Sequence, residues 1–485
     1  MDVWKLLHDF WHYGVAALTV VLSTIASGHA LLHKRESRAA VSWVGFVWLV
    51  PLVGAVLYFI LGVNRIKRRA IELRGQMERF RAQPAIEPCA PASLAELLPP
   101  EAAHLAALAT VVDRVAGRPL LPGNLIEPLV NGDAAYPAML DAIASARESI
   151  TLATYIFDRD EAGLAFARAL GDAVRRGVQV RVLIDATGTR YSWPSILRVL
   201  RREKIPYARF LPSFLFWRLM SMNLRNHRKT LVIDGRVGFT GGMNIRIGHW
   251  LSKHPRSPVQ DIHFRIEGPA VAQLQEIFAD DWLFTTRESL RGPLWFPLLE
   301  ARGPVLARGI ADGPDDDTDP LRWAILAGLA VARHSVRIVT PYFLPDPAVI
   351  SALNVAAMRG VRVDIILPSK CNLPFVLWAS RAQWWQVLAL GCRLWLTPPP
   401  FDHSKLMLVD GAWSLVGSAN WDPRSLRLNF ELNLEGYDPA LAAKLETIFA
   451  QKMQAAREVT LAEVDGRSLP SKLRDGAARL LAPYL

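Results

Sequence analysis

The chain opens with two long apolar runs. Residues 13–32 and 41–63 contain no Asp, Glu, Lys or Arg. At about 1.5 Å per residue, the second run would extend roughly 34 Å as a helix, which is enough to cross the hydrocarbon core of a bilayer. The first run is weaker because Ser23, Thr24 and His29 interrupt it. We therefore predict a hairpin of two transmembrane helices.

Two other structures fit these runs less well. The first run resembles the apolar part of a cleaved signal peptide, but Lys5 is the only Lys or Arg before it and the second run follows at once. A hairpin buried inside a soluble protein would not need an apolar helix as long as the second run. We therefore predict that both apolar runs stay in the mature protein and lie in a membrane.

The remainder of the chain contains one α/β pattern twice. In residues 147–157 an apolar strand pattern begins, and it is followed by a helical pattern that ends at Gly177 and by a second strand pattern up to Asp185. Residues 333–343 begin the same order again, with Gly360 in the place of Gly177. Each copy predicts a strand, an amphipathic helix closed by glycine, and another strand. The fold class is therefore α/β with an internal repeat.

The boundaries of the repeat divide the chain into segments. Residues 82–100 are rich in Pro and Ala, which is typical of a linker or an irregular surface segment. The predicted segments are residues 1–70 with the two helices, 71–115 as linker and juxtamembrane segment, 116–300 and 301–465 as the two halves, and 466–485 as a basic amphipathic tail.

Composition adds an anionic partner to this picture. The net charge is +11, 51% of the residues are hydrophobic, and there are 16 tryptophans. The charge fits either nucleic acid or an acidic membrane, and the tryptophans favour the membrane because indole prefers the headgroup region. The three cysteines lie far apart in no Cys-x-x-Cys spacing, so neither a disulfide framework nor a zinc site is expected.

The distribution of basic residues predicts an orientation. Three lie between the two apolar runs, whereas eight lie before the first run or shortly after the second. Because positive charge is retained on the cytoplasmic side, a hairpin would place both the N-terminus and the main body in the cytoplasm. The basic residues would also hold anionic headgroups, at about 1 kcal/mol for each residue near the surface.

A motif of the form His-x-Lys-x4-Asp occurs once in each half. Its residues are His227, Lys229 and Asp234 in the first copy and His403, Lys405 and Asp410 in the second. Strand alternation places the His and the Lys on one face, and the apolar residues that follow predict a buried strand. After six more residues each copy has a glycine-rich turn, which lets backbone amides approach an anion. These turns supply Gly242 and Asn244 in the first half and Ser418 and Asn420 in the second.

Two such motifs suit the exchange of one alcohol for another at a phosphodiester. One imidazole would attack phosphorus, and the other would protonate the departing oxygen and then deprotonate the incoming alcohol. The lysines and asparagines would neutralise and hold the non-bridging oxygens as charge builds on the phosphoryl group. This chemistry requires no metal and no cofactor, and no carboxylate cluster in the sequence suggests a metal site.

Two carboxylates follow the motifs at similar distances. Asp261 lies 34 residues after His227, and Glu431 lies 28 residues after His403. A carboxylate bonded to the second ring nitrogen would fix each tautomer and stabilise the imidazolium. The alternative for either residue is an ordinary surface carboxylate. Four further histidines of this region are expected to be structural or on the surface, namely His249, His254, His263 and His334.

These motifs resemble those of the phospholipase D superfamily and, within it, the bacterial cardiolipin synthases. The resemblance covers nearly the whole chain and includes the aromatic and glycine pattern of residues 43–65 and the segments 261–271, 281–282 and 418–431. It implies two similar phospholipase D-like α/β/α halves with pseudo-twofold symmetry and an active site in the cleft between them. The chain departs from the family's pattern at residues 244–250, where an acidic stretch is expected.

The resemblance also implies an activity. Two phosphatidylglycerols would give cardiolipin and glycerol through a phosphatidyl-histidine, with His227 as the nucleophile and His403 as the acid and base. A phospholipase D-type hydrolase and a cardiolipin synthase that takes phosphatidylethanolamine as donor remain as alternatives. The expected partners are phosphatidylglycerol, other anionic phospholipids and the membrane, but not nucleic acid. The expected location is the bacterial inner membrane, as a multi-pass protein with a cytoplasmic catalytic body.

The acyl chains of such a lipid need a path, and two aromatic stretches suit it. Residues 210–222 precede the first motif, and residues 373–378 and 384–385 precede the second. Both stretches have an amphipathic pattern with Phe and Trp, which is typical of a bilayer interface. Packing in the core is the alternative for any single residue. As units we expect both stretches to lie at the membrane.

Overall fold

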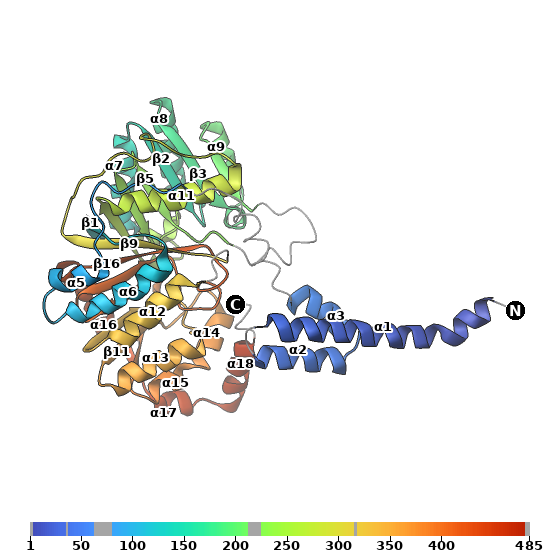
Figure 1. The fold of residues 1–485 in the computed structure, drawn as a ribbon. Coiled ribbons are helices and arrows are strands. Elements are labelled where there is room, and N and C mark those ends of the chain that lie inside the picture. The colour runs from blue at the N-terminus through green and yellow to red at the C-terminus, as the bar shows by residue number, and fades with distance from the viewer. Residues whose placement is uncertain (1–2, 35–36, 63–79, 212–224, 315–317, 481–485) are drawn as a thin grey trace. The chain divides into compact units, whose positions relative to one another are not determined.

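A computed structural model describes residues 3–34, 37–62, 80–211, 225–314 and 318–480. The chain forms two compact units, a small one that contains the N-terminal apolar segment and a large one that contains both motifs. Each unit is described by itself. Figure 1 shows the elements of both, coloured along the chain.

The small unit has one long helix and one interrupted helix. α1 (Val3–His33) is the only described helix that is long and apolar enough to cross a membrane, over Phe10–His33. The second apolar run does not form the single long helix expected of it. It divides into α2 (Ser37–Leu49), α3 (Val53–Leu57) and the π-helical turn η1 (Tyr58–Gly62).

Pro51 is the physical reason for this interruption. Proline lacks the N–H that would continue the helix, and its ring disfavours helical backbone in the residue before it. Leu52 then adopts a φ of 64°. A Cβ at Gly54 would lie 2.8 Å from the carbonyl oxygen of Phe46, so α3 returns closely against α2. The 13 residues of α2 extend only about 20 Å, which is less than the hydrocarbon thickness.

Polar contacts between small and aromatic residues hold the small unit together. His29 Nδ1 and the Tyr58 hydroxyl lie 2.7 Å apart, and Trp48 donates to Ser27 Oγ at 3.0 Å. Its core cluster consists of Ala26, Ala30, Val47, Ala55 and Tyr58. The three alanines allow α1 and α3 to approach their neighbours closely.

The large unit is built on one sheet of 15 strands, in the order β17-β12-β11-β10-β14-β15-β16-β9-β1-β8-β6-β5-β2-β3-β4. The first half supplies β1 (Leu121–Val130), β2 (Ser149–Thr154), β3 (Gln179–Asp185), β4 (Tyr207–Phe210), β5 (Thr230–Ile233), β6 (Val237–Gly241) and β8 (Ile262–Glu267). The second supplies β9 (Val305–Asp312), β10 (Ser335–Val339), β11 (Arg362–Pro368), β12 (Arg393–Thr397), β14 (Leu406–Val409), β15 (Trp413–Gly417), β16 (Glu431–Tyr437) and β17 (Arg457–Val459).

The strand order shows the predicted duplication. Read outward from the β1–β9 pair, the order of the first half corresponds to that of the second, with β2, β5 and β6 in the places of β10, β14 and β15. Within each half, the strand before the helix and the strand after it are parallel neighbours, β2 with β3 and β10 with β11. Gly177 and Gly360, which close the two equivalent helices, have φ values of 91° and 89°.

Helices cover both faces of the sheet (Figure 1). In the first half these are α7 (Asn131–Ser145), α8 (Glu161–Arg175) and α11 (Ala270–Thr286); in the second they are α12 (Pro320–Val331), α13 (Pro347–Met358) and α16 (Pro439–Ala455). One core cluster contains residues of α11 and α16 together with strands of both halves. The other face has a separate cluster in each half. A shared core on one face therefore joins the two halves.

The segments outside the two halves also fold. Within the expected linker, α5 (Pro91–Leu97) and α6 (Ala106–Ala116) bury Leu94 and Leu108 in the core of the second half. The segment is therefore not simply irregular. At the C-terminal end, α17 (Leu461–Asp465) precedes α18 (Leu469–Leu480), which packs on α14 (Pro374–Arg381). Of the first aromatic stretch, residues 212–222 lie outside the described residues.

Candidate active site

Each motif histidine lies directly before a buried strand of the sheet. His227 and Lys229 precede β5, and His403 and Lys405 precede β14. All four residues of either strand are buried. Both strands run through the middle of their half of the sheet. The motif side chains lie at the edge of the sheet that the starts of these strands form, where segments of the two halves contact each other.

Two short backbone contacts bring the halves together at this edge. His227 N donates to Phe430 O at 2.9 Å, and Phe430 N donates to Arg225 O at 2.8 Å. On the other side, β13 (Phe401–Asp402) pairs in parallel with β7 (Val259–Gln260), and His403 N donates to Gln260 O at 2.8 Å. The residue after Phe430 is Glu431, and the residue after Gln260 is Asp261. The backbone thus places each carboxylate beside the histidine of the other half.

The imidazole and carboxylate pairs are therefore crossed between the halves. His227 Nδ1 lies 3.0 Å from Glu431 Oε2, and His403 Nδ1 lies 2.8 Å from Asp261 Oδ2. All four side chains are buried or nearly so. With Nδ1 engaged in each ring, Nε2 is the nitrogen left for chemistry. Both predicted carboxylates thus contact a motif histidine.

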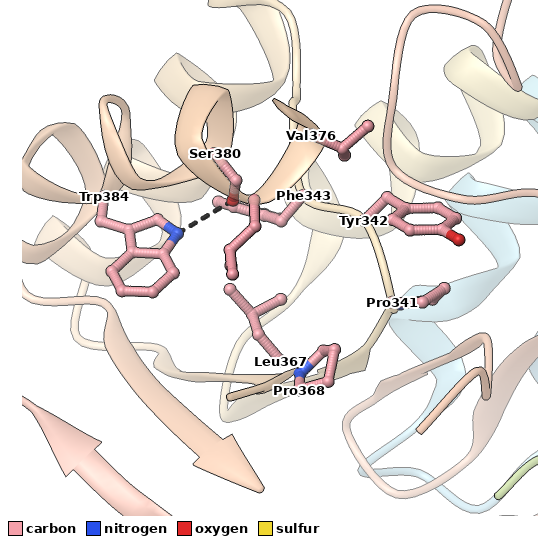
Figure 2. A pocket seen from close by; sticks show the side chains of 9 residues that line it. Pro341, Tyr342, Phe343, Leu367, Pro368, Val376, Ser380 and Trp384 are labelled. Carbon is pink, nitrogen blue, oxygen red and sulfur yellow. Dashed lines mark hydrogen bonds between the residues drawn. The ribbon is translucent and has the colours of Figure 1, made fainter. Parts of the chain in front are cut away.

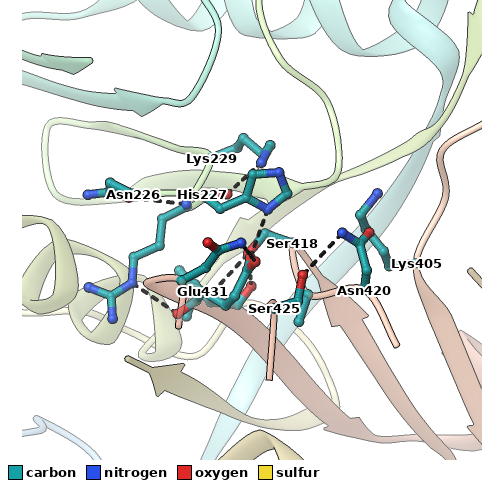
Figure 3. Close-up of polar contacts among 12 residues, drawn as sticks. Asn226, His227, Lys229, Lys405, Ser418, Asn420, Ser425 and Glu431 are labelled. Atoms are coloured by element: carbon teal, nitrogen blue, oxygen red, sulfur yellow. Dashed lines mark hydrogen bonds and ion pairs between the residues drawn. The ribbon is translucent and has the colours of Figure 1, made fainter. Parts of the chain in front are cut away.

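The two carboxylates have different surroundings. Glu431 accepts from Ser418 Oγ at 2.5 Å and from Asn429 Nδ2 at 3.0 Å, as Figure 3 shows for the Ser418 side. In the other half, Gly242 takes the place of Ser418, and a Cβ there would lie 2.4 Å from Asp261 Oδ1. Gly242 is therefore needed to make room for the carboxylate, whereas Ser418 stabilises its counterpart with a hydrogen bond.

Burial and charge set the protonation of this centre. Burial lowers the pKa of His227 and holds the pKa of His403 well below its usual range, and the motif lysines lower both further. Burial raises the pKa of Asp261. Burial alone would also raise the pKa of Glu431, but its contacts with His227, Lys229 and Ser418 lower it overall. The lowered pKa of Glu431 favours a negative charge beside His227.

The two motif lysines are buried at the same centre. Lys229 Nζ donates to the carbonyl oxygen of its own motif histidine at 2.5 Å, and Lys405 Nζ makes the same contact with His403. Burial lowers the pKa of Lys229 to about 7 and that of Lys405 to about 8. An anion bound between them would restore their charge, because it compensates the burial.

Both predicted asparagines also lie in this region. Asn244 Oδ1 accepts from Ile156 N at 3.0 Å, which leaves its amide nitrogen as a donor. Asn420 Nδ2 donates to Ser425 Oγ at 3.1 Å, and its Oδ1 is buried without a hydrogen-bond partner (Figure 3). Within the described ranges, no group of three His, Cys, Asp or Glu side chains is placed to hold a metal ion.

Comparison with known proteins identifies the family of this double site. A family model described as cardiolipin synthase, PLD-like domain matches residues 139–282 and 325–453, and one described as phospholipase D-nuclease N-terminal matches residues 21–62. The chain is 32% identical over 487 aligned positions to cardiolipin synthase A of Pseudomonas putida (strain GB-1), with 99% of each chain covered. The chain belongs to the cardiolipin synthase family. It is therefore a phosphatidyltransferase of the phospholipase D superfamily.

Two further matches agree with this membership. Cardiolipin synthase of Geobacillus thermodenitrificans (strain NG80-2) is 30% identical over 487 positions, which cover 99% of this chain and 96% of that one. The crystal structure of phosphatidylserine synthase from Haemophilus influenzae superposes with a TM-score of 0.61 at 15% identity, over 78% of this chain and 100% of that one. The match to phosphatidylserine synthase shows that the two proteins have the same fold.

The aspartates of the two motifs lie away from the paired histidines. The four residues of β5 lie between Lys229 and Asp234, which are therefore about 17 Å apart along the extended chain. Asp234 accepts from the backbone amides of Arg147, Glu148 and Ser149 at 2.7–3.2 Å. The sequence groups this aspartate with the catalytic residues; its contacts instead join two strands at the far end of the sheet.

Asp410 makes the equivalent contacts in the second half. It accepts at 2.8 Å from the amides of Arg333, His334 and Ser335, and it lies 2.7 Å from His104 Nε2. Both aspartates have a φ of 50°. We therefore propose a structural role for the pair in place of the catalytic role expected of them.

Replacing either aspartate by alanine should lower stability rather than chemistry. Asp234→Ala leaves three backbone amides without their acceptor and keeps a strained positive φ, so the free energy of unfolding should fall by about 2–4 kcal/mol. Denaturant titration measures this loss, and kcat per folded molecule should stay within about threefold. Asp234→Asn, which tolerates positive φ, is the matched control. A large fall in kcat with unchanged stability would contradict the structural role.

Some residues of the centre were not expected from the sequence. The centroid of the Tyr155 ring lies 5.2 Å from the centroid of the His227 ring and 5.8 Å from Lys229 Nζ. The His249 ring lies 6.4 Å from the His403 ring, and burial lowers its pKa to about 3. The aromatic residue at the end of the repeated strand is the one signal for Tyr155. Nothing in the spacing around His249 indicates its position.

Arg228, the residue after His227, forms an ion pair within the first half and also joins the halves. Arg228 Nη1 donates to Asp281 Oδ1 at 2.7 Å, and Asn226 Nδ2 donates to the other oxygen of Asp281 at 2.9 Å. Arg228 further donates to the carbonyl oxygens of Glu431 and Asp312 in the second half. The residues on both sides of His227 are thus fixed, so the ring has little freedom to move.

Proposed function

We propose that this enzyme transfers the phosphatidyl group of one phosphatidylglycerol to a second one, giving cardiolipin and glycerol. The observation that supports this most directly is the pair of imidazole and carboxylate contacts, crossed between the halves and accompanied by two buried lysines. Two histidines with free Nε2 atoms allow a double displacement, in which one alcohol leaves before another enters.

His227 is the nucleophile in this proposal. Its Nε2 attacks phosphorus, the bond to the glycerol oxygen breaks, and His403 gives that oxygen a proton. The hydroxyl of the second phosphatidylglycerol then loses its proton to His403 and attacks phosphorus, which releases His227. A covalently substituted imidazole is positively charged, and the lowered pKa of Glu431 keeps a negative charge beside it. Asp261 has a raised pKa and contacts His403, the histidine that only exchanges protons in this proposal.

The remaining polar residues would hold the phosphodiester. Lys229 and Lys405 would neutralise its non-bridging oxygens, and the amide of Asn244 would donate to one of them. The amide nitrogen of Asn420 donates to Ser425, and its oxygen is buried without a partner among the described residues. This oxygen would orient the substrate by accepting a hydrogen bond from it. We assign no cofactor to the reaction.

The N-terminal unit supports attachment to a membrane. We propose that α1 anchors the enzyme in the bacterial inner membrane with the catalytic unit in the cytoplasm. Because α2 is too short to span the bilayer, we infer the orientation from α1 as a single span. The basic residues on either side of α1 also place the catalytic unit in the cytoplasm. Lys5 is the only Lys or Arg before the apolar run, whereas Lys34, Arg35 and Arg38 follow it directly.

The assay that tests the function uses labelled phosphatidylglycerol in mixed micelles, with and without phosphatidylethanolamine. We expect labelled cardiolipin and glycerol in equal amounts, without a need for phosphatidylethanolamine. Phosphatidic acid as the sole product would show a hydrolase and overturn the proposal. A cardiolipin yield that depends on phosphatidylethanolamine would assign a different donor. The His403→Ala enzyme, purified in the same way, controls for contaminating activity.

The pH dependence should reveal the buried lysines. A lysine is charged below its pKa, so charge at Lys229 and Lys405 is lost as the pH rises through about 7 and 8. We expect kcat/KM to fall in that range, whereas kcat should hold to higher pH because the bound phosphodiester raises both values. The acid limb should lie below about 6.5, the usual histidine pKa. A kcat/KM that stays flat to about pH 10 would contradict this assignment.

A further inference from the structure

The C-terminal helix α18 presents an apolar stripe outward. Leu469, Leu473 and Leu480 are 68%, 65% and 78% exposed. Their spacing of four and seven residues places them on one side of the helix. Asp475 and Ala478 lie on the opposite side and are buried, where α18 packs on α14. One side of α18 thus completes the core of the large unit while the other exposes three leucines.

The neighbouring helix α14 contributes to the same surface. Arg474 of α18 lies over the Trp378 ring at 4.7 Å, and the rings of Trp378 and Phe375 lie 5.1 Å apart. Phe375 and Leu373, at the start of α14, are 55% and 47% exposed. We call the three leucines of α18 together with Leu373 and Phe375 the apolar face.

Positive charge surrounds the apolar face. Residues 369–392 and 466–480 contain six basic residues and one acidic one. That acid, Asp475, already contacts Arg467 at 2.6 Å and Arg474 at 2.7 Å. The nearby acids of α17 are Glu463, which pairs with Arg457, and Asp465. The pKa of Arg381 is lowered, first by burial and also by Arg474, Arg467 and Arg457 around it. An anionic surface would relieve this crowding of positive charge.

The apolar face is continuous with the active site through α14. Val376 and Ala379 of α14 form a small cluster with Ala478 of α18 and Leu344, against which Tyr342 packs. Figure 2 shows Tyr342 at a pocket that Val376, Ser380 and Leu367 also line. The Tyr342 ring lies 6.4 Å from the ring of His403. One layer of side chains therefore separates the helix pair from the second motif.

We propose that the apolar face is the surface by which the catalytic unit docks on an anionic lipid bilayer. Leucines that enter the acyl boundary while flanking lysines and arginines contact phosphates are the two components of interfacial binding. The proposal rests on the proposed function, since an enzyme that consumes bilayer lipids needs its active site against them. Docking through α18 would hold the His403 side of the cleft next to the lipid.

The docking test uses the full chain in vesicles. A fluorophore is attached to Leu473→Cys in a Cys89→Ser, Cys371→Ser background, where the remaining Cys392 is buried. The matched control is Met358→Cys on α13, which is 61% exposed and lies outside the apolar face. In phosphatidylglycerol vesicles we expect spin-labelled lipid to quench the label at position 473 and not the label at 358. Absence of quenching at 473, or equal quenching at both positions, would overturn the proposal.

A second measurement separates docking from catalysis. Leu473→Glu should lower the rate on vesicles about tenfold, as expected when one leucine leaves the acyl region, while the rate in detergent mixed micelles stays within twofold. Met358→Glu should change neither rate. If the unmodified enzyme makes no cardiolipin in micelles, the proposed function fails, but quenching still tests docking. A spectral shift at position 473 that grows with protein concentration in lipid-free detergent would show a second copy on this face and overturn the proposal.

Discussion

Replacing His227 or His403 by alanine should reduce turnover by at least about 10⁴-fold, because each imidazole makes or receives a bond that nothing else in the centre can supply. Both rings lie in fixed pairs with a carboxylate, at 3.0 and 2.8 Å. Removing one ring leaves its carboxylate without that partner, but the backbone contacts between the halves remain. The variants should therefore remain folded, which unfolding midpoints and circular dichroism can check.

The two alanine variants should differ in what accumulates. With labelled phosphatidylglycerol, the His403→Ala enzyme should form a covalent phosphatidyl adduct on His227 slowly and then fail to release it. The His227→Ala enzyme should form none. With the label in the phosphate, acid-labile label that is stable to alkali, located by peptide mapping, identifies the phosphohistidine. An adduct on His403 in the His227→Ala enzyme would exchange the two roles, and full activity in either variant would exclude the double displacement.

The repeat in the sequence predicted the halves and their strands because both depend on local pattern. Strands β2, β3, β10 and β11 lie where the alternating runs indicate. The crossed pairs could not be predicted in the same way. Each carboxylate lies nearer in sequence to the histidine of its own half, and the crossing follows from contacts at the seam, such as His403 N with Gln260 O. Such contacts between distant segments leave no periodic signal in the sequence.

Two other differences also have physical causes. Hydropathy alone predicts one long helix for residues 41–63, but the missing N–H of Pro51 and the positive φ of Leu52 turn the chain back. The sequence predicts a catalytic role for the motif aspartates because they recur with the histidines, and the structural role that we propose rests on the backbone amides from which each carboxylate accepts, at a strand end with a φ of 50°. Recurrence in a sequence shows that a residue is needed in both halves and does not show for what.

The crossed pairing gives the second large effect. Glu431→Gln and Asp261→Asn keep the size of the side chain but remove the charge that faces each imidazole and change the tautomer it favours. By the behaviour of comparable histidine and carboxylate pairs, each should lower kcat about 10²–10³-fold with little change in KM. Because Glu431 contacts His227, Glu431→Gln should slow adduct formation, as His227→Ala does. Asp261→Asn should instead slow both the formation and the release of the adduct, as His403→Ala does, because His403 exchanges a proton in each step.

Double variants separate crossed pairing from pairing within a half. Adding Glu431→Gln to His227→Ala should cost nothing more, because the ring that the carboxylate orients is already absent. Adding Glu431→Gln to His403→Ala should lower adduct formation by the full 10²–10³-fold, about the loss caused by Glu431→Gln alone. Ser418→Ala, which removes the 2.5 Å hydrogen bond to Glu431 together with the contacts of Ser418 Oγ with the Leu432 backbone, is the milder control and should act on the same step with a smaller loss. If Glu431→Gln cost nothing more in the His403→Ala enzyme, Glu431 would serve the histidine of its own half, and the crossed arrangement would not be the one that works in catalysis.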